Sequence, residues 1–133
     1  KLEYIPGDLV SYNGNIVTIE HSDGYYATYY DEDEFLQEIN VNVIEGISLT
    51  PAILEKNGWK RNGGQYSFTY KPYAGGKVEL IGFFIEIFKD VHDMLKHRYF
   101  QITHKNKVIC GCFYVHEIQH LLFGLGINHK MEV

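Results

Sequence analysis

The residues with the most evident chemistry lie near the C-terminal end, in the run His116-Glu117-Ile118-Gln119-His120. The run matches H-E-x-x-H, which on a helix places two imidazoles one turn apart on one face, with a carboxylate beside them. Such a pair can bind zinc, and Glu117 would then take a proton from a metal-bound water during attack on a peptide carbonyl. The motif therefore raises the hypothesis of a zinc-dependent, metallopeptidase-like hydrolase with Glu117 as its catalytic residue.

The surrounding sequence gives that hypothesis little support. The extended motif H-E-x-x-H-x-x-G-x-x-H requires Gly at position 123 and His at position 126, where this chain has Phe123 and Gly126. His129 and Glu132 are the candidates for a third zinc ligand, and few residues follow the motif to build a substrate cleft. We therefore favour no catalytic residue, metal ligand or cofactor, and we keep zinc bound by the two motif histidines as the alternative.

Two cysteines lie just before the motif, and their spacing bears on a second kind of metal site. Cys110 and Cys112 are separated by one residue, which in a strand sends both side chains to one face. A disulfide between them would be strained, so the chain has no disulfide framework and its thiols fit a reducing compartment. Together with the two histidines they would give four ligands for a structural zinc, although C-x-C is not a standard zinc spacing.

The overall composition limits the class of protein. With 133 residues, 45% hydrophobic and 15% aromatic, the chain is long enough to bury a core. A net charge of −5 disfavours non-specific binding to nucleic acid, so a nucleic-acid accessory protein is only a second alternative. No segment approaches the length of a membrane span and no apolar leader opens the chain, so we expect a cytoplasmic protein without a membrane partner.

Residues 1–47 alternate short apolar runs with turn signals, which is typical of a meander of strands. Asn13-Gly14 is the strongest hairpin turn, between strands at 8–12 and 15–20. Tyr25 to Tyr30 supply the next strand, the acidic run Asp31 to Glu34 predicts a loop, and residues 39–44 predict another strand. We interpret this part as an SH3-like small β-barrel.

Residues 48–133 predict an α+β unit that packs closely against the barrel. Thr50-Pro51 is a helix start, because Thr is a preferred N-cap and Pro suits the first helical position. The later residues predict antiparallel strands, an uncertain segment at 90–96 and a C-terminal helix. These strands are expected at 65–71, 78–88 (centrally placed), 100–104 and 108–113, and the helix at 114–123.

Three segments carry a resemblance to a known group of proteins. They are Gly7-Asp8-Leu9-Val10 with Tyr12-Asn13-Gly14-Asn15-Ile16-Val17; Gly46-Ile47-Ser48-Leu49-Thr50-Pro51 with Ile53-Leu54 and Asn57-Gly58-Trp59; and Tyr114-Val115-His116-Glu117-Ile118-Gln119-His120-Leu121-Leu122-Phe123. In type and order they resemble a family of short hypothetical proteins from gut Bacteroidales bacteria and their phages or mobile elements. That family commonly has Gln and Asn at the positions of Glu117 and His120. The resemblance thus implies that H-E-x-x-H is a coincidence of two positions, and it implies no known activity.

The tyrosine-rich strand and its acidic loop favour one function over the others. Exposed tyrosines bring a large contact area at a low entropic cost, and a neighbouring acidic loop suits a basic partner. The residues concerned are Tyr25, Tyr26, Tyr29, Tyr30, Asp31 and Asp33. We therefore predict a non-enzymatic protein-interaction module of bacterial or mobile-element origin. The competing interpretation is that these tyrosines only cover the core of the barrel.

Overall fold

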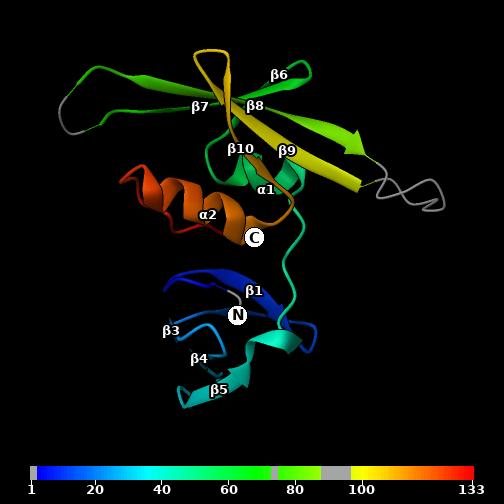
Figure 1. The fold of residues 1–133 in the computed structure, drawn as a ribbon, viewed down its shortest axis with the longest axis vertical. Helices are drawn as coiled ribbons and strands as arrows, with labels where there is room; N and C mark the ends of the chain where they lie inside the picture. Colours follow the sequence, from blue (N-terminus) through cyan, green and yellow to red (C-terminus); the bar gives the residue numbers. More distant parts are fainter. Residues whose placement is uncertain (1–2, 73–74, 88–96) are drawn as a thin grey trace. The chain divides into compact units, whose positions relative to one another are not determined.

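The computed structural model describes residues 3–72, 75–87 and 97–133, which fold into two compact units (Figure 1). The first unit comprises Lys1–Ser48 and Tyr114–Met131, and the second comprises Leu49–Phe113 and Glu132–Val133. Helices and antiparallel sheets occur together, as the α+β prediction required. The boundary expected after residue 47 lies close to the first junction, but the C-terminal helix groups with the first unit and not with the second.

The first unit begins with the hairpin of β1 (Leu9–Tyr12) and β2 (Asn15–Thr18). Its two-residue turn has φ values of 50° at Asn13 and 76° at Gly14. Positive φ at both positions is what a type I′ turn requires, and Asn-Gly adopts it with little steric cost. The predicted hairpin is therefore confirmed, with Tyr12 opposite Asn15.

A three-stranded antiparallel sheet follows, made of β3 (His21–Ser22), β4 (Tyr26–Tyr30) and β5 (Leu36–Asn40). The strand predicted for residues 39–44 was wrong beyond residue 40, because Val41–Val43 form the 3-10 helix η1. The side chain of Asn40 accepts a hydrogen bond from the backbone N–H of Asn42 at 2.9 Å, and this local bond stabilises the turn in place of a strand.

The segment that links β2 to β3 in the first unit extends both sheets. The N–H of Ile19 donates to the carbonyl of Asp8, next to β1, and the N–H of Glu20 donates to the carbonyl of Thr28 in β4, both at 2.8 Å. A continuous core fills the unit and contains Val10, Ile19, Ala27, Ile39, Val41 and Ile44. The described residues form no closed barrel, so the SH3-like barrel stays a prediction.

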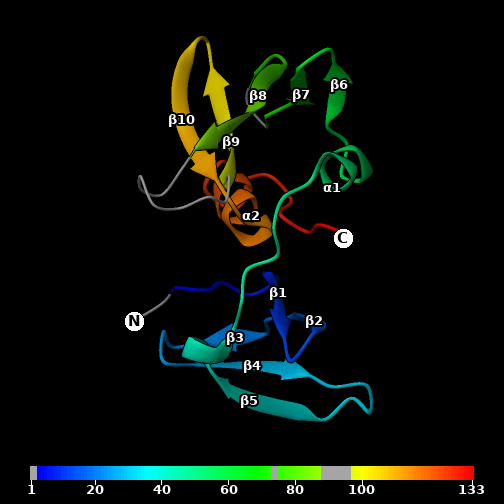
Figure 2. The same ribbon diagram turned by 90° about the vertical axis from the view of Figure 1, so that its right-hand side faces the viewer.

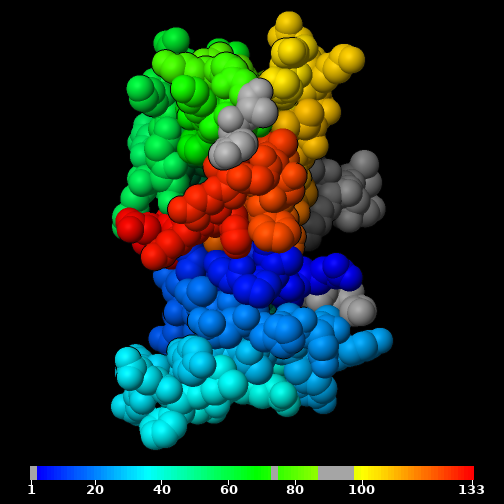
Figure 3. Space-filling model, turned by 90° about the vertical axis from the view of Figure 1, so that its left-hand side faces the viewer, coloured from blue at the N-terminus to red at the C-terminus, as the bar shows by residue number. Residues whose placement is uncertain are grey.

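Helix α2 (Val115–Gly124) completes the first unit and lies beside β1. The C-terminal helix expected at 114–123 is confirmed, and it buries the apolar residues Val115, Ile118 and Leu122. It also buries Gln119, a polar residue. Figure 3 shows the segment before β1 in dark blue lying against the orange surface of α2.

The second unit contains α1 (Pro51–Lys56) and one antiparallel sheet (Figure 2). Thr50 is the N-cap of α1, as predicted, and its hydroxyl accepts a hydrogen bond from the N–H of Ile53 at 3.2 Å. The sheet has the order β10-β9-β8-β7-β6, with bounds β6 (Lys60–Asn62), β7 (Gln65–Tyr70), β8 (Val78–Ile87), β9 (His97–His104) and β10 (Lys107–Cys112). β8 lies centrally, as expected, and the segment predicted at 90–96 lies outside the described residues.

One face of this sheet carries an aromatic core around Phe100, which is completely buried. Its ring centroid lies 5.2 Å from that of Trp59 and 5.0 Å from that of Phe84. A Cβ at Gly82 would lie 2.1 Å from the Phe100 ring, so only glycine lets the ring approach β8 this closely. In the part of the chain that the structure describes, no helix has the length and apolar character of a membrane span.

Candidate functional site

The two histidines of the H-E-x-x-H motif lie on one face of α2 with their ring centroids 5.7 Å apart. The Nε2–H of His120 donates to Oδ2 of Asp8 at 2.6 Å, and the same oxygen accepts the backbone N–H of Ile5 at 3.0 Å. Asp8 is fully buried, whereas the side chain of His120 is 32% exposed. His120 is therefore the hydrogen-bond partner of a buried carboxylate, a contact that was not predicted from the sequence.

The two histidines have opposite pKa shifts. The hydrogen bond from His120 to Asp8 raises the pKa of His120, and this effect outweighs the opposing effect of burial. Burial lowers the pKa of His116, against the weaker attraction of Asp8 and Glu117. The buried Nδ1 of His116 has no hydrogen-bond partner among the described residues, so a proton on this ring would be poorly compensated.

Glu117 and Gln119 have structural roles in α2. Oε1 of Glu117 accepts the backbone N–H of Tyr114 at 2.9 Å and so caps the first turn of the helix. Gln119 accepts the N–H of Leu9 at 2.8 Å and donates to the carbonyls of Gly7 at 2.8 Å and His129 at 3.0 Å. These bonds fasten α2 to the start of β1.

The metal hypotheses can be compared with this geometry. Over the described ranges 3–72, 75–87 and 97–133, no three His, Cys, Asp or Glu side chains are grouped so that they could hold a metal ion. Cys110 and Cys112 belong to β10 of the second unit, whereas the motif histidines belong to the first unit. The zinc hydrolase and the structural zinc stay predictions.

A groove of about 580 Å³ lies on the first unit and is lined by the β1–β2 hairpin and the end of β4 with its following loop. We call it the tyrosine groove; its lining residues are Tyr12, Asn13, Asn15, Ile16, Val17, Thr18, Glu20, Tyr29, Tyr30, Asp31, Glu32 and Asp33. Tyr12, Val17 and Tyr29 are half-buried and pack on the core, and the rings of Tyr12 and Tyr29 lie 6.0 Å apart. The groove therefore has an aromatic floor that the core holds in place.

The described lining of the tyrosine groove is acidic. Four carboxylates line it, and none of the described lining residues is Lys, Arg or His. One of the four, Asp31, also holds the loop in shape: Oδ1 accepts the N–H groups of Asp33 and Phe35 at 2.9 Å, and Oδ2 accepts the side chain of Gln37 at 2.8 Å. The hydrogen bond from Phe35 is the main cause of a lowered pKa at Asp31, which therefore stays ionised.

The structure separates the residues predicted for binding into two groups. Tyr29, Tyr30, Asp31 and Asp33 line the tyrosine groove. The other two, Tyr25 and Tyr26, lie at the opposite end of β4 beside a smaller hollow of about 280 Å³, where they are 61% and 48% exposed. The wall that the β1–β2 hairpin supplies was not predicted from the sequence, although the hairpin itself was.

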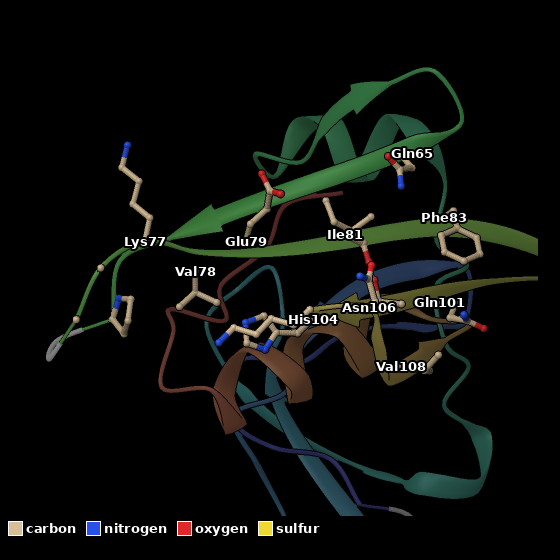
Figure 4. A pocket seen from close by; sticks show the side chains of 15 residues that line it. Gln65, Lys77, Val78, Glu79, Ile81, Phe83, Gln101, His104, Asn106 and Val108 are labelled. Carbon is tan, nitrogen blue, oxygen red and sulfur yellow. The ribbon is translucent and has the colours of Figure 1, made fainter.

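A larger hollow of about 830 Å³ lies over the sheet of the second unit (Figure 4). It is lined by residues of β7 to β10 and of the turns between them, with Ile81, Phe83 and Gln101 among them. Lys77 and Lys105 bring positive charge and Glu79 brings negative charge, so the hollow has no uniform electrostatic character. It gives less indication of a ligand than the tyrosine groove does.

Comparison with known proteins adds no assignment, since no family model, curated protein or solved structure matches the chain.

Proposed function

We propose that this chain is a non-enzymatic protein-interaction module that binds a basic segment of another protein in the tyrosine groove. One observation supports the proposal above the others: in the part of the chain that the structure describes, the lining combines an aromatic floor with four carboxylates and no basic side chain. A Lys or Arg side chain in the groove would gain both from the negative field and from contact with an aromatic ring face.

The floor of the groove is suited to such a ligand because it is already in place before binding. Tyr12 and Tyr29 are fixed against the core, so little side-chain freedom is lost when a ligand arrives. Tyr30 is 57% exposed at the edge of the groove and can cover the aliphatic part of a bound cation. Asp31 keeps the loop ordered through its three hydrogen bonds, which leaves Glu32 and Asp33 on the exposed rim.

The scaffold and the biological setting belong to the same proposal. The segment from β2 to β3, which pairs first with β1 and then with β4, supports a small SH3-like barrel as the carrier of the groove. The resemblance to proteins of gut Bacteroidales and their mobile elements supports a bacterial or phage protein as the partner. The C-x-C spacing of Cys110 and Cys112, which disfavours a structural disulfide, supports action in the cytoplasm.

A peptide-binding assay tests the proposal. The probe is a fluorescently labelled oligo-arginine peptide, whose anisotropy is followed as the protein is added at low and at high salt. An oligo-glutamate peptide of the same length is the charge-reversed control. We expect binding of the oligo-arginine peptide alone, weakened by salt because exposed charges are screened.

Matched variants locate the binding site. Glu32→Gln with Asp33→Asn removes two rim charges worth together about 1 kcal/mol, and so raises the dissociation constant about five-fold. Tyr30→Ala is expected to weaken binding about two- to five-fold, whereas Glu38→Gln and Tyr26→Ala, which lie outside the groove, are expected to change it little. Equal losses in the control variants, or no binding of the oligo-arginine peptide, would contradict the proposal.

A further inference from the structure

We propose that Cys110 and Cys112 form a dithiol site that reacts with a low-molecular-weight disulfide of the glutathione type and closes to an intramolecular disulfide. The two Sγ atoms lie 3.0 Å apart on β10. Their positions pair with Ile102 and Phe100 of β9, so both thiols lie on the same face of the sheet. The site is separate from the tyrosine groove and does not depend on it.

The backbone around the two cysteines favours the close approach of their Sγ atoms. The register between β10 and β9 shifts between Val108 and Cys110, which is the mark of a bulge or irregularity in the strand. Gly111 lies between the cysteines, and a Cβ there would come within 2.7 Å of the Tyr99 ring. The absence of a side chain at Gly111 therefore lets the segment lie against Tyr99 and gives its backbone freedom to adjust when the sulfurs move together.

The two thiols differ in access, which sets the order of reaction. Cys110 is partly exposed on an edge strand of the sheet, whereas Cys112 is completely buried. A reagent in solution meets Cys110 first. Cys112 is then in place to attack the sulfur of Cys110 from 3.0 Å away, without opening of the core.

The reaction balances in two exchange steps. The Cys110 thiolate attacks one sulfur of the small disulfide, forms a mixed disulfide and releases one small thiol. The Cys112 thiolate then attacks Sγ of Cys110, forms the Cys110–Cys112 bond and releases the second small thiol. In total, the protein dithiol is oxidised by loss of two electrons and two protons, and one small disulfide is reduced to two thiols.

The Cys110–Cys112 disulfide is expected to be easily reduced back to the dithiol. Residues two apart in an extended strand have Cα atoms near the upper limit that a disulfide spans, so the closed bond is strained. Strained disulfides are reduced more readily than structural ones. The pair is thus suited to respond to an oxidising change and to return to the dithiol state afterwards.

Mass spectrometry of the intact native protein tests this directly, because the chain contains only two cysteines. After exposure to oxidised glutathione, the wild-type chain should lose the mass of two hydrogens and retain no glutathione. Cys112→Ser should retain one glutathione on Cys110, since the second step is blocked. Cys110→Ser should react several-fold more slowly than Cys112→Ser, because its remaining thiol is buried.

A second measurement uses the wild-type protein, so its result does not depend on whether a variant folds. Alkylation under native conditions, followed by peptide mapping, should label Cys110 before Cys112. The proposal is overturned if the wild-type protein retains glutathione without closing, if it forms disulfide-linked dimers in place of the internal bond, or if Cys112 is labelled as fast as Cys110.

Discussion

The opposite pKa shifts of the two motif histidines predict a distinctive dependence of stability on pH. The pKa of His120 is raised in the folded state, so its contribution is fully present below the unfolded value of about 6.5 and is lost as pH rises through the folded value. The pKa of His116 is lowered in the folded state. His116 therefore lowers the free energy of unfolding as pH falls below about 6.5, because the unfolded chain then binds a proton on this ring and the folded chain does not. Together they favour a stability maximum near pH 6.5 within the range where histidines titrate.

The magnitude follows from the partners of each ring. One group that is protonated in only one of the two states changes the free energy of unfolding by at most about 1.4 kcal/mol per pH unit. The bond from His120 to Asp8 is charge-assisted, but the His120 side chain is 32% exposed and solvent screens it, so we expect about 1–2 kcal/mol in total. Glu117 and Glu3 add weaker attraction in the same direction.

Two variants separate the contributions in urea unfolding measured from about pH 5.5 to about pH 9, the range around the ordinary histidine pKa. His120→Gln can keep a neutral hydrogen bond to Asp8, so the wild-type advantage over it should be largest in acid and should shrink as pH rises. His116→Phe keeps the contacts with the rings of Tyr4 and Tyr114 but does not titrate, so the wild type should lose stability relative to it below about pH 6.5. A pH-independent difference for His120→Gln would refute the reasoning, as would a difference of the opposite sign.

Two further predictions concern packing and polar contacts, and thermal or urea unfolding measures both. Gly82→Ala should destabilise the chain by about 1–3 kcal/mol, because the new Cβ would overlap the Phe100 ring, whereas Gly64→Ala, with no atom within 4 Å, should change stability by less than about 0.5 kcal/mol. Gln119→Leu should cost about 2–4 kcal/mol, because it leaves the N–H of Leu9 and the carbonyl of Gly7 without their side-chain partner. A loss as large in Gly64→Ala, or unchanged stability in Gln119→Leu, would contradict these accounts.

Features determined by neighbouring residues were predictable from the sequence. The Asn13-Gly14 turn and the Thr50 N-cap depend on the backbone preferences of two or three adjacent residues, and both are found where the sequence indicated. The 3-10 helix at Val41–Val43 was missed because β-branched residues favour a strand, while one side-chain bond from Asn40 decides otherwise.

Features that join distant parts of the chain were not predictable in the same way. Asp8 and His120 are 112 residues apart, and periodicity within a segment carries no information on which distant side chain it will meet. The tyrosine groove has the same origin, since the acidic loop was evident in the sequence but its facing wall comes from the hairpin. Four of the twelve lining residues were therefore predicted for binding, and the shape of the groove was not predicted.

The three polar residues that define the H-E-x-x-H run each have contacts within the protein. A zinc hydrolase needs one nitrogen from each of the two imidazoles directed at the metal and a carboxylate close to the metal-bound water. Here His120 is bonded to the buried Asp8, the ring of His116 lies among the rings of Tyr4, Tyr114 and His120, and Glu117 caps the helix. The variants of the two histidines measure what these contacts contribute to stability.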